Sequence, residues 1–134
     1  HNDELQACYR EITANEQQWE EYNLEGAEYV ITAFGTVARI AKSAIVELKE
    51  QGINVGLVRP ITVWPFPYDA VKKAAEQPGV KAVLDVELNE GQMLEDVKLA
   101  INGAKPVDFF GHLGSQMPTT EEIKAKIISM KEGK

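Results

Sequence analysis

Apolar and polar positions along the chain switch repeatedly between two spacings, one typical of strands and one typical of helices. Short apolar runs rich in β-branched residues predict buried strands. They cover residues 28–34, 54–58, 80–86 and 107–110. Apolar residues at helical spacing follow each run, and they predict helices over residues 36–51, 67–78, 91–102 and from 119 onward. This regular alternation predicts an α/β fold, a three-layer sandwich around a mostly parallel sheet.

The first part of the chain is more polar than the rest. Residues 3–21 predict a helix whose apolar stripe is thin for its length. A helix this polar needs another surface on which to pack. We therefore interpret residues 1–25 as a helical linker from an upstream domain outside this chain, and residues 26–134 as the domain itself.

Composition narrows the classes of partner. The 134 residues carry a formal net charge of −7, so the surface repels phosphate backbones and nucleic acid is not an expected partner. No apolar run reaches the roughly 18 residues of a membrane span, and we expect no membrane association. Cys8 is the single cysteine, which excludes an internal disulfide and fits a cytoplasmic location. His1 and His112 do not stand at metal-ligand spacing from it, so no metal site is expected.

Ligand-binding groups of parallel α/β sheets lie in the loops at the carboxyl ends of the strands. In the first such loop, Gly35 and Thr36 precede a helix, and Thr36 fits two roles. A threonine there caps the helix, or it helps the helix N-terminus to bind an anion. The cap is the commoner role, and we expect it.

The second loop holds Trp64 and Phe66 among three prolines, which keep the backbone stiff and extended. Aromatic rings in such a loop either pack into the core or anchor a protein interface. The interface hypothesis predicts that at least one of the two rings is exposed in this chain.

Polar residues gather in the third loop. Glu87, Asn89 and Gln92 follow a strand with an apolar interior, so the carboxylate needs a partner. Arg59, at the end of a neighbouring strand, is one candidate, and nearby backbone N–H groups are another. We expect a structural polar cluster in which Asn89 caps the next helix. The alternative is a catalytic role for Glu87. No combination of residues predicts a nucleophile with its base, and we expect His112 in the fourth loop to be exposed.

Taken together, the loop sequences resemble a known family. The similar segments are Thr32–Arg39 (TAFGTVAR), Val58–Pro67 (VRPITVWPFP), Glu87–Met93 (ELNEGQM) and residues 111–123. They are similar to the second domain of the α-type subunit of 2-oxoacid:ferredoxin oxidoreductases, most closely of the 2-oxoisovalerate type. The segment around Leu5 and Ile12 resembles the linker that leaves the thiamine-pyrimidine domain of that subunit.

The resemblance implies a fold like the transketolase C-terminal domain and a place in an enzyme that oxidatively decarboxylates a 2-oxoacid, forms acyl-CoA and reduces ferredoxin. Thiamine diphosphate, Mg²⁺, iron–sulfur clusters and CoA are implied for the whole enzyme, and none of them for this chain. The partners implied are the other domains and subunits, and ferredoxin through the whole complex. No catalytic residue is carried over, so we expect a non-catalytic assembly domain.

Two other hypotheses fit an α/β fold. A free-standing module would bind a small ligand or an anion at the helix N-termini. A receiver-like signalling domain is disfavoured because no acidic cluster follows the first predicted strand.

Overall fold

A computed structural model of the chain describes residues 2–15, 18–61, 65–88, 93–111 and 117–133. The helices are α1 (Asn2–Asn15), α2 (Thr36–Glu50), α3 (Tyr68–Glu76), α4 (Leu94–Ile101) and α5 (Thr120–Lys131). The strands are β1 (Trp19–Tyr22), β2 (Tyr29–Ala33), β3 (Val55–Pro60), β4 (Ala82–Glu87) and β5 (Val107–Gly111). None of the helices in these segments is both long and apolar enough to cross a membrane.

The strands form one sheet in the order β1-β3-β2-β4-β5. All neighbouring pairs are parallel except β1 with β3. From β2 the chain moves to β3 on one side, then crosses back to β4 on the other side. The strand order therefore reverses between β2 and β4, the point where ligands bind in many open α/β sheets.

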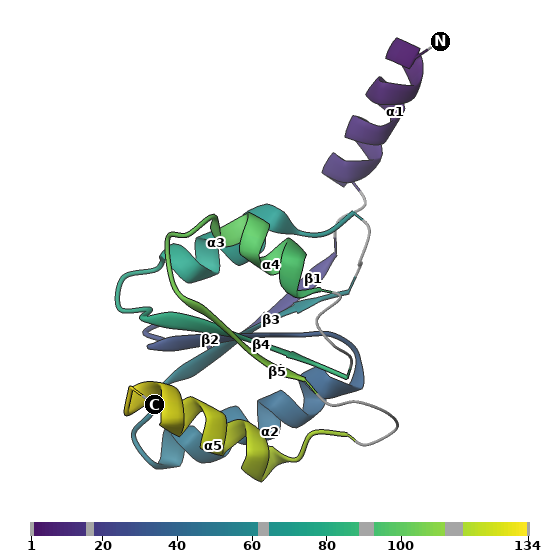
Figure 1. Cartoon of the computed structure of the whole chain (residues 1–134). Coiled ribbons are helices and arrows are strands. Elements are labelled where there is room, and N and C mark those ends of the chain that lie inside the picture. Colours follow the sequence, from purple (N-terminus) through teal and green to yellow (C-terminus); the bar gives the residue numbers. More distant parts are fainter. Residues whose placement is uncertain (1, 16–17, 62–64, 89–92, 112–116, 134) are drawn as a thin grey trace.

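Two layers of helices cover the sheet, α3 and α4 on one face and α2 and α5 on the other (Figure 1). Each face has its own buried apolar cluster. β2 is buried at every position because it lies centrally and both of its faces are covered. The predicted mostly parallel three-layer α/β fold is confirmed.

The N-terminal segment differs from its predicted structure. The helix ends at Asn15, and the prediction of helix up to residue 21 is wrong for 19–21, which belong to β1, an antiparallel edge strand paired with β3. Figure 1 shows α1 extending away from the sheet and its covering helices. The sheet thus begins before residue 25, where we placed the domain boundary.

Specific contacts hold β1 and its following turn against β3. Asn23, at a φ of 54°, donates from Nδ2 to Asn54 Oδ1 and to the carbonyl of Val55, both at 2.8 Å. The next residue along β3 from Val55 is Gly56, and a Cβ there would lie 2.6 Å from Leu24 Cδ2. The same Cβ would lie 3.0 Å from Leu24 Cα and 3.1 Å from the Asn23 carbonyl oxygen, so glycine is needed here because the backbone of the turn passes so close.

Helix ends test the cap predictions. Thr119 and Glu122 stand at the spacing of a capping box, and they form one at the start of α5: each side chain accepts the other's backbone N–H at 3.1 Å. The cap expected from Thr36 is wrong: Gly35 is the N-cap residue of α2, and no side chain caps this helix. Gly35 has a φ of 63°, and this turn already places Thr36 inside the first helical turn.

Candidate functional site

A buried polar cluster lies at the carboxyl ends of β2 and β4, where the strand order reverses. Thr32 of β2 and Asp85 of β4 are register partners. The Thr32 hydroxyl Oγ1 donates to Asp85 Oδ1 at 2.8 Å, and both residues are fully buried. They lie on the sheet face covered by α3 and α4. Asp85 is two residues from Val83 along β4 and therefore on the same face, and Val83 belongs to the apolar cluster there.

Glu87 lies two residues further along β4, on the same face as Asp85. Its Oε1 accepts the backbone N–H of Met93 at 2.7 Å, at the residue that precedes α4. The side chain thus supplies an acceptor to the start of a helix, where N–H groups have no intrahelical partner. The prediction that Glu87 bonds to nearby backbone N–H groups is confirmed.

The two carboxyl groups of this cluster influence each other. Burial, followed by the hydrogen bond and charge of Glu87, raises the pKa of Asp85 to about 9, and the Thr32 hydroxyl opposes this shift. This shift favours the neutral form of the Asp85 carboxyl. A carboxylic acid and a carboxylate can share a hydrogen bond, whereas two carboxylates at the same place repel each other.

Arg59 does not join this cluster, which lies on the other face of the sheet. Arg59 is the register partner of Glu20 on β1, and their side chains form an ion pair at 3.5 Å. Lys42 of α2 also pairs with Glu20, and this contact lowers the pKa of the Glu20 carboxyl. Arg59 is two residues from Leu57 along β3, so both lie on the face covered by α2, opposite to Glu87. Without β1 in the predicted sheet, this pairing was missed.

Phe66 corrects one of the interface expectations. Its ring is 2% exposed, belongs to the apolar cluster beneath α3 and α4, and packs edge-on against Tyr68 at a centroid distance of 4.9 Å. Phe66 is therefore buried within this domain, so the expectation that at least one of the two rings is exposed now depends on Trp64. Trp64 lies outside the described residues, so its interface role stays a prediction.

The other predicted site residues are only partly placed. Asn89, Gln92 and His112 lie outside the described residues, so their predicted roles stay predictions. Gly35 and Thr36 stand at the start of α2, and their alternative role in anion binding also stays a prediction.

Thr32 and Asp85 are residues of this site that sequence reasoning missed, although the sequence carries a signal for Asp85. An acidic residue interrupts the apolar run 82–86, and Glu87 follows at strand spacing. Two acids on one face of a strand that is otherwise buried indicate a paired carboxyl cluster.

Three exposed apolar side chains lie at this edge of the sheet. Phe34, Ile61 and Leu88 directly follow β2, β3 and β4, the adjacent parallel strands, and their exposed fractions are 45%, 47% and 37%. We call these three residues the carboxyl-edge patch.

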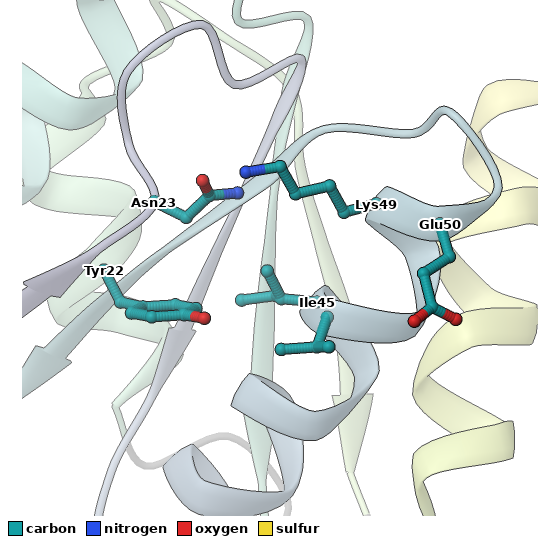
Figure 2. A pocket seen from close by; sticks show the side chains of 6 residues that line it. Tyr22, Asn23, Ile45, Lys49 and Glu50 are labelled. Carbon is teal, nitrogen blue, oxygen red and sulfur yellow. The ribbon is translucent and has the colours of Figure 1, made fainter.

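A separate cavity of about 360 Å³ lies between β1 and α2. Figure 2 shows Tyr22 and Asn23 on one side, facing Ile45 and Lys49 of α2. Across the residues that the structure describes, no group of three or more His, Cys, Asp and Glu side chains is placed to hold a metal ion.

Comparison with protein families places most of the chain in one domain family. Residues 27–123 match the family described as pyruvate:ferredoxin oxidoreductase core domain II. The ketoisovalerate oxidoreductase subunit VorB of Methanothermobacter marburgensis is 40% identical over 123 residues. That match covers 92% of this chain and 34% of VorB, so the chain spans about a third of this curated relative.

Solved structures agree on the fold. A chain of the 2-oxoglutarate:ferredoxin oxidoreductase from Magnetococcus marinus superposes with a TM-score of 0.74 at 21% identity, over 90% of this chain and 21% of that one. A split-gene transketolase superposes with a TM-score of 0.68 at 19% identity, over 82% and 40%. These matches confirm the expected transketolase-like fold.

Proposed function

The chain belongs to the pyruvate:ferredoxin oxidoreductase core domain II family, and we propose that it is a non-catalytic assembly domain of a 2-oxoacid:ferredoxin oxidoreductase. The proposed substrate of the whole enzyme is 2-oxoisovalerate, by analogy with VorB. In this proposal the whole enzyme forms acyl-CoA and passes electrons to ferredoxin in the cytoplasm. In this proposal α1, which precedes the first strand of the sheet, connects the domain to another part of its subunit.

The carboxyl-edge patch is the observation that carries the proposal. Many α/β enzymes place reactive groups at this edge of the sheet. Among the described residues at this edge, the acidic Asp85 and Glu87 are buried, while the apolar Phe34, Ile61 and Leu88 are exposed. Adjacent exposed apolar side chains fit a surface that another protein part covers. The proposed partner is a neighbouring domain or subunit of the oxidoreductase.

The cofactors of the reaction belong to other parts of the enzyme in this proposal. An iron–sulfur cluster needs several thiolates, and this chain has a single cysteine. Its residues therefore do not suit the cluster. We assign thiamine diphosphate, Mg²⁺ and CoA to other domains as well. The role of this domain is to position those other domains relative to one another.

The isolated 134-residue chain should show no oxidoreductase turnover. The measurement is reduction of an artificial electron acceptor by 2-oxoisovalerate in the presence of CoA, Mg²⁺ and thiamine diphosphate, with a buffer blank as control. Cofactor-dependent reduction above that blank, which increases with the concentration of the chain, would overturn the non-catalytic assignment.

A further inference from the structure

Asp85 and Glu87 together have four buried carboxyl oxygens, and only two of these accept a hydrogen bond from the described residues. Asp85 Oδ1 accepts from Thr32, and Glu87 Oε1 accepts from Met93 N–H. Asp85 Oδ2 and Glu87 Oε2 are also buried, and neither has a hydrogen-bond partner in the part of the chain that the structure describes. A buried oxygen without a partner is costly, and here two such atoms belong to neighbouring acids.

A single proton satisfies both atoms at once. If Asp85 is protonated on Oδ2, this O–H group can donate to Glu87 Oε2, and each of the four carboxyl oxygens then takes part in one hydrogen bond. We propose that Asp85 and Glu87 form a buried proton-binding site, which holds one shared proton at neutral pH and so links the stability of the carboxyl edge to pH. This inference is independent of the enzyme to which the domain belongs.

The surroundings of the site on the sheet favour a proton over a paired basic side chain. The register partners of Asp85 on the adjacent strands are Thr32 and Phe109. On β3, Val58 is the register partner of Thr32, and Arg59 faces the opposite side of the sheet. No cation on these strands therefore faces the two acids within the described residues.

The helices above this face bring charges only at their outer surfaces. Their titratable side chains are Tyr68, Asp69, Lys72, Lys73 and Glu76 on α3 and Glu95, Asp96 and Lys98 on α4. All are exposed except Asp96, which is half-buried and accepts the Tyr68 hydroxyl at 2.6 Å. The influences on the pKa of Asp85 come from burial, Glu87 and Thr32, and none comes from these helices.

The proton gives stability a definite pH dependence. The folded chain keeps the proton up to about pH 9, while an aspartate in the unfolded chain loses it near its ordinary value of 3.8. Between these values the folded state binds more protons than the unfolded state. Stability from this site therefore falls as pH rises through that window, and levels off above it.

The test compares the melting temperature of the wild-type chain with that of Asp85→Asn at several pH values within the window. The asparagine amide can donate to Glu87 and accept from Thr32 without a proton, so its melting temperature should change less with pH and exceed that of wild type at the alkaline end. Asp69→Asn, at an exposed position on α3, is the matched control and should keep the wild-type profile. Parallel pH profiles for wild type and Asp85→Asn would overturn the proposal.

A second measurement decides the matter even where the variant folds poorly. Infrared spectra of the wild-type chain at neutral pH should contain the C=O stretching band of a protonated carboxylic acid, which should disappear as the pH rises past about 9. A spectrum at neutral pH with only carboxylate bands would show that the site holds no proton.

Discussion

Replacing Glu87 with alanine should lower the free energy of unfolding by about 1–3 kcal/mol, the usual cost of a buried polar group left without its partner. The Glu87 carboxylate accepts the N–H of Met93 and is 6% exposed. Alanine leaves that N–H unpaired at the start of α4 and removes the neighbour that shares hydrogen bonding with Asp85. Urea denaturation of the two chains would measure the difference.

Two control variants separate this effect from general damage. Glu87→Gln keeps an oxygen for Met93 and gains an amide that can donate to Asp85, so it should retain most of the lost stability. Glu76→Ala removes an exposed carboxylate at the end of α3 and should change stability by less than about 0.5 kcal/mol. A Glu87→Ala chain as stable as wild type would mean that the polar cluster contributes nothing to the fold.

Leu84→Ala should have a larger effect, about 2–5 kcal/mol of destabilisation. Leu84 lies in the middle of β4, is fully buried, and packs in the apolar cluster beneath α2 and α5. Its removal loses apolar burial and leaves a cavity, because a close-packed core relaxes only partly around the missing atoms.

The chain offers a matched control for this change. Leu99 on α4 is 69% exposed, so Leu99→Ala should alter stability by less than about 0.5 kcal/mol. The comparison uses the denaturant midpoint and slope of each variant. Equal losses for Leu84→Ala and Leu99→Ala would contradict the assignment of Leu84 to the core.

The hydrophobic pattern was sufficient for the central part of the fold. Parallel strands that are buried on both faces have continuous apolar sequences, as β2 does. The amphipathic helix α2 buries its apolar face. The capping box at Thr119 could also be predicted, because its hydrogen bonds are local. These features depend on residues close together in the sequence.

Features that depend on distant residues were not predicted. β1 is a four-residue edge strand with a largely exposed, polar sequence, so no apolar run marks it. The partner of Arg59 follows from β1 and was missed with it. The pairing of Thr32 with Asp85 depends on the sheet order, which brings β2 beside β4 across the reversal point.

Phe66 and Thr36 show how local residue types can mislead. An aromatic in a proline-rich loop fits an interface, but the loop path decides whether its ring reaches the core, and Phe66 does. A threonine before a helical run fits an N-cap, but the positive φ of Gly35 moves the helix start by one residue. Backbone geometry of this kind has no clear signature in residue type alone.

The most direct test of the assembly role is a chimaera in which this chain replaces the matching segment of VorB. The two segments are 40% identical over 123 residues. The exchanged subunit should assemble with its partners in size-exclusion chromatography and support 2-oxoisovalerate-dependent reduction of an acceptor. With Glu87→Ala added, the amount of assembled complex should fall, while turnover per assembled complex stays unchanged. A Glu87→Ala complex that assembles as fully as its unmutated counterpart but has lost turnover would contradict the account, because this domain would then act in the chemistry itself.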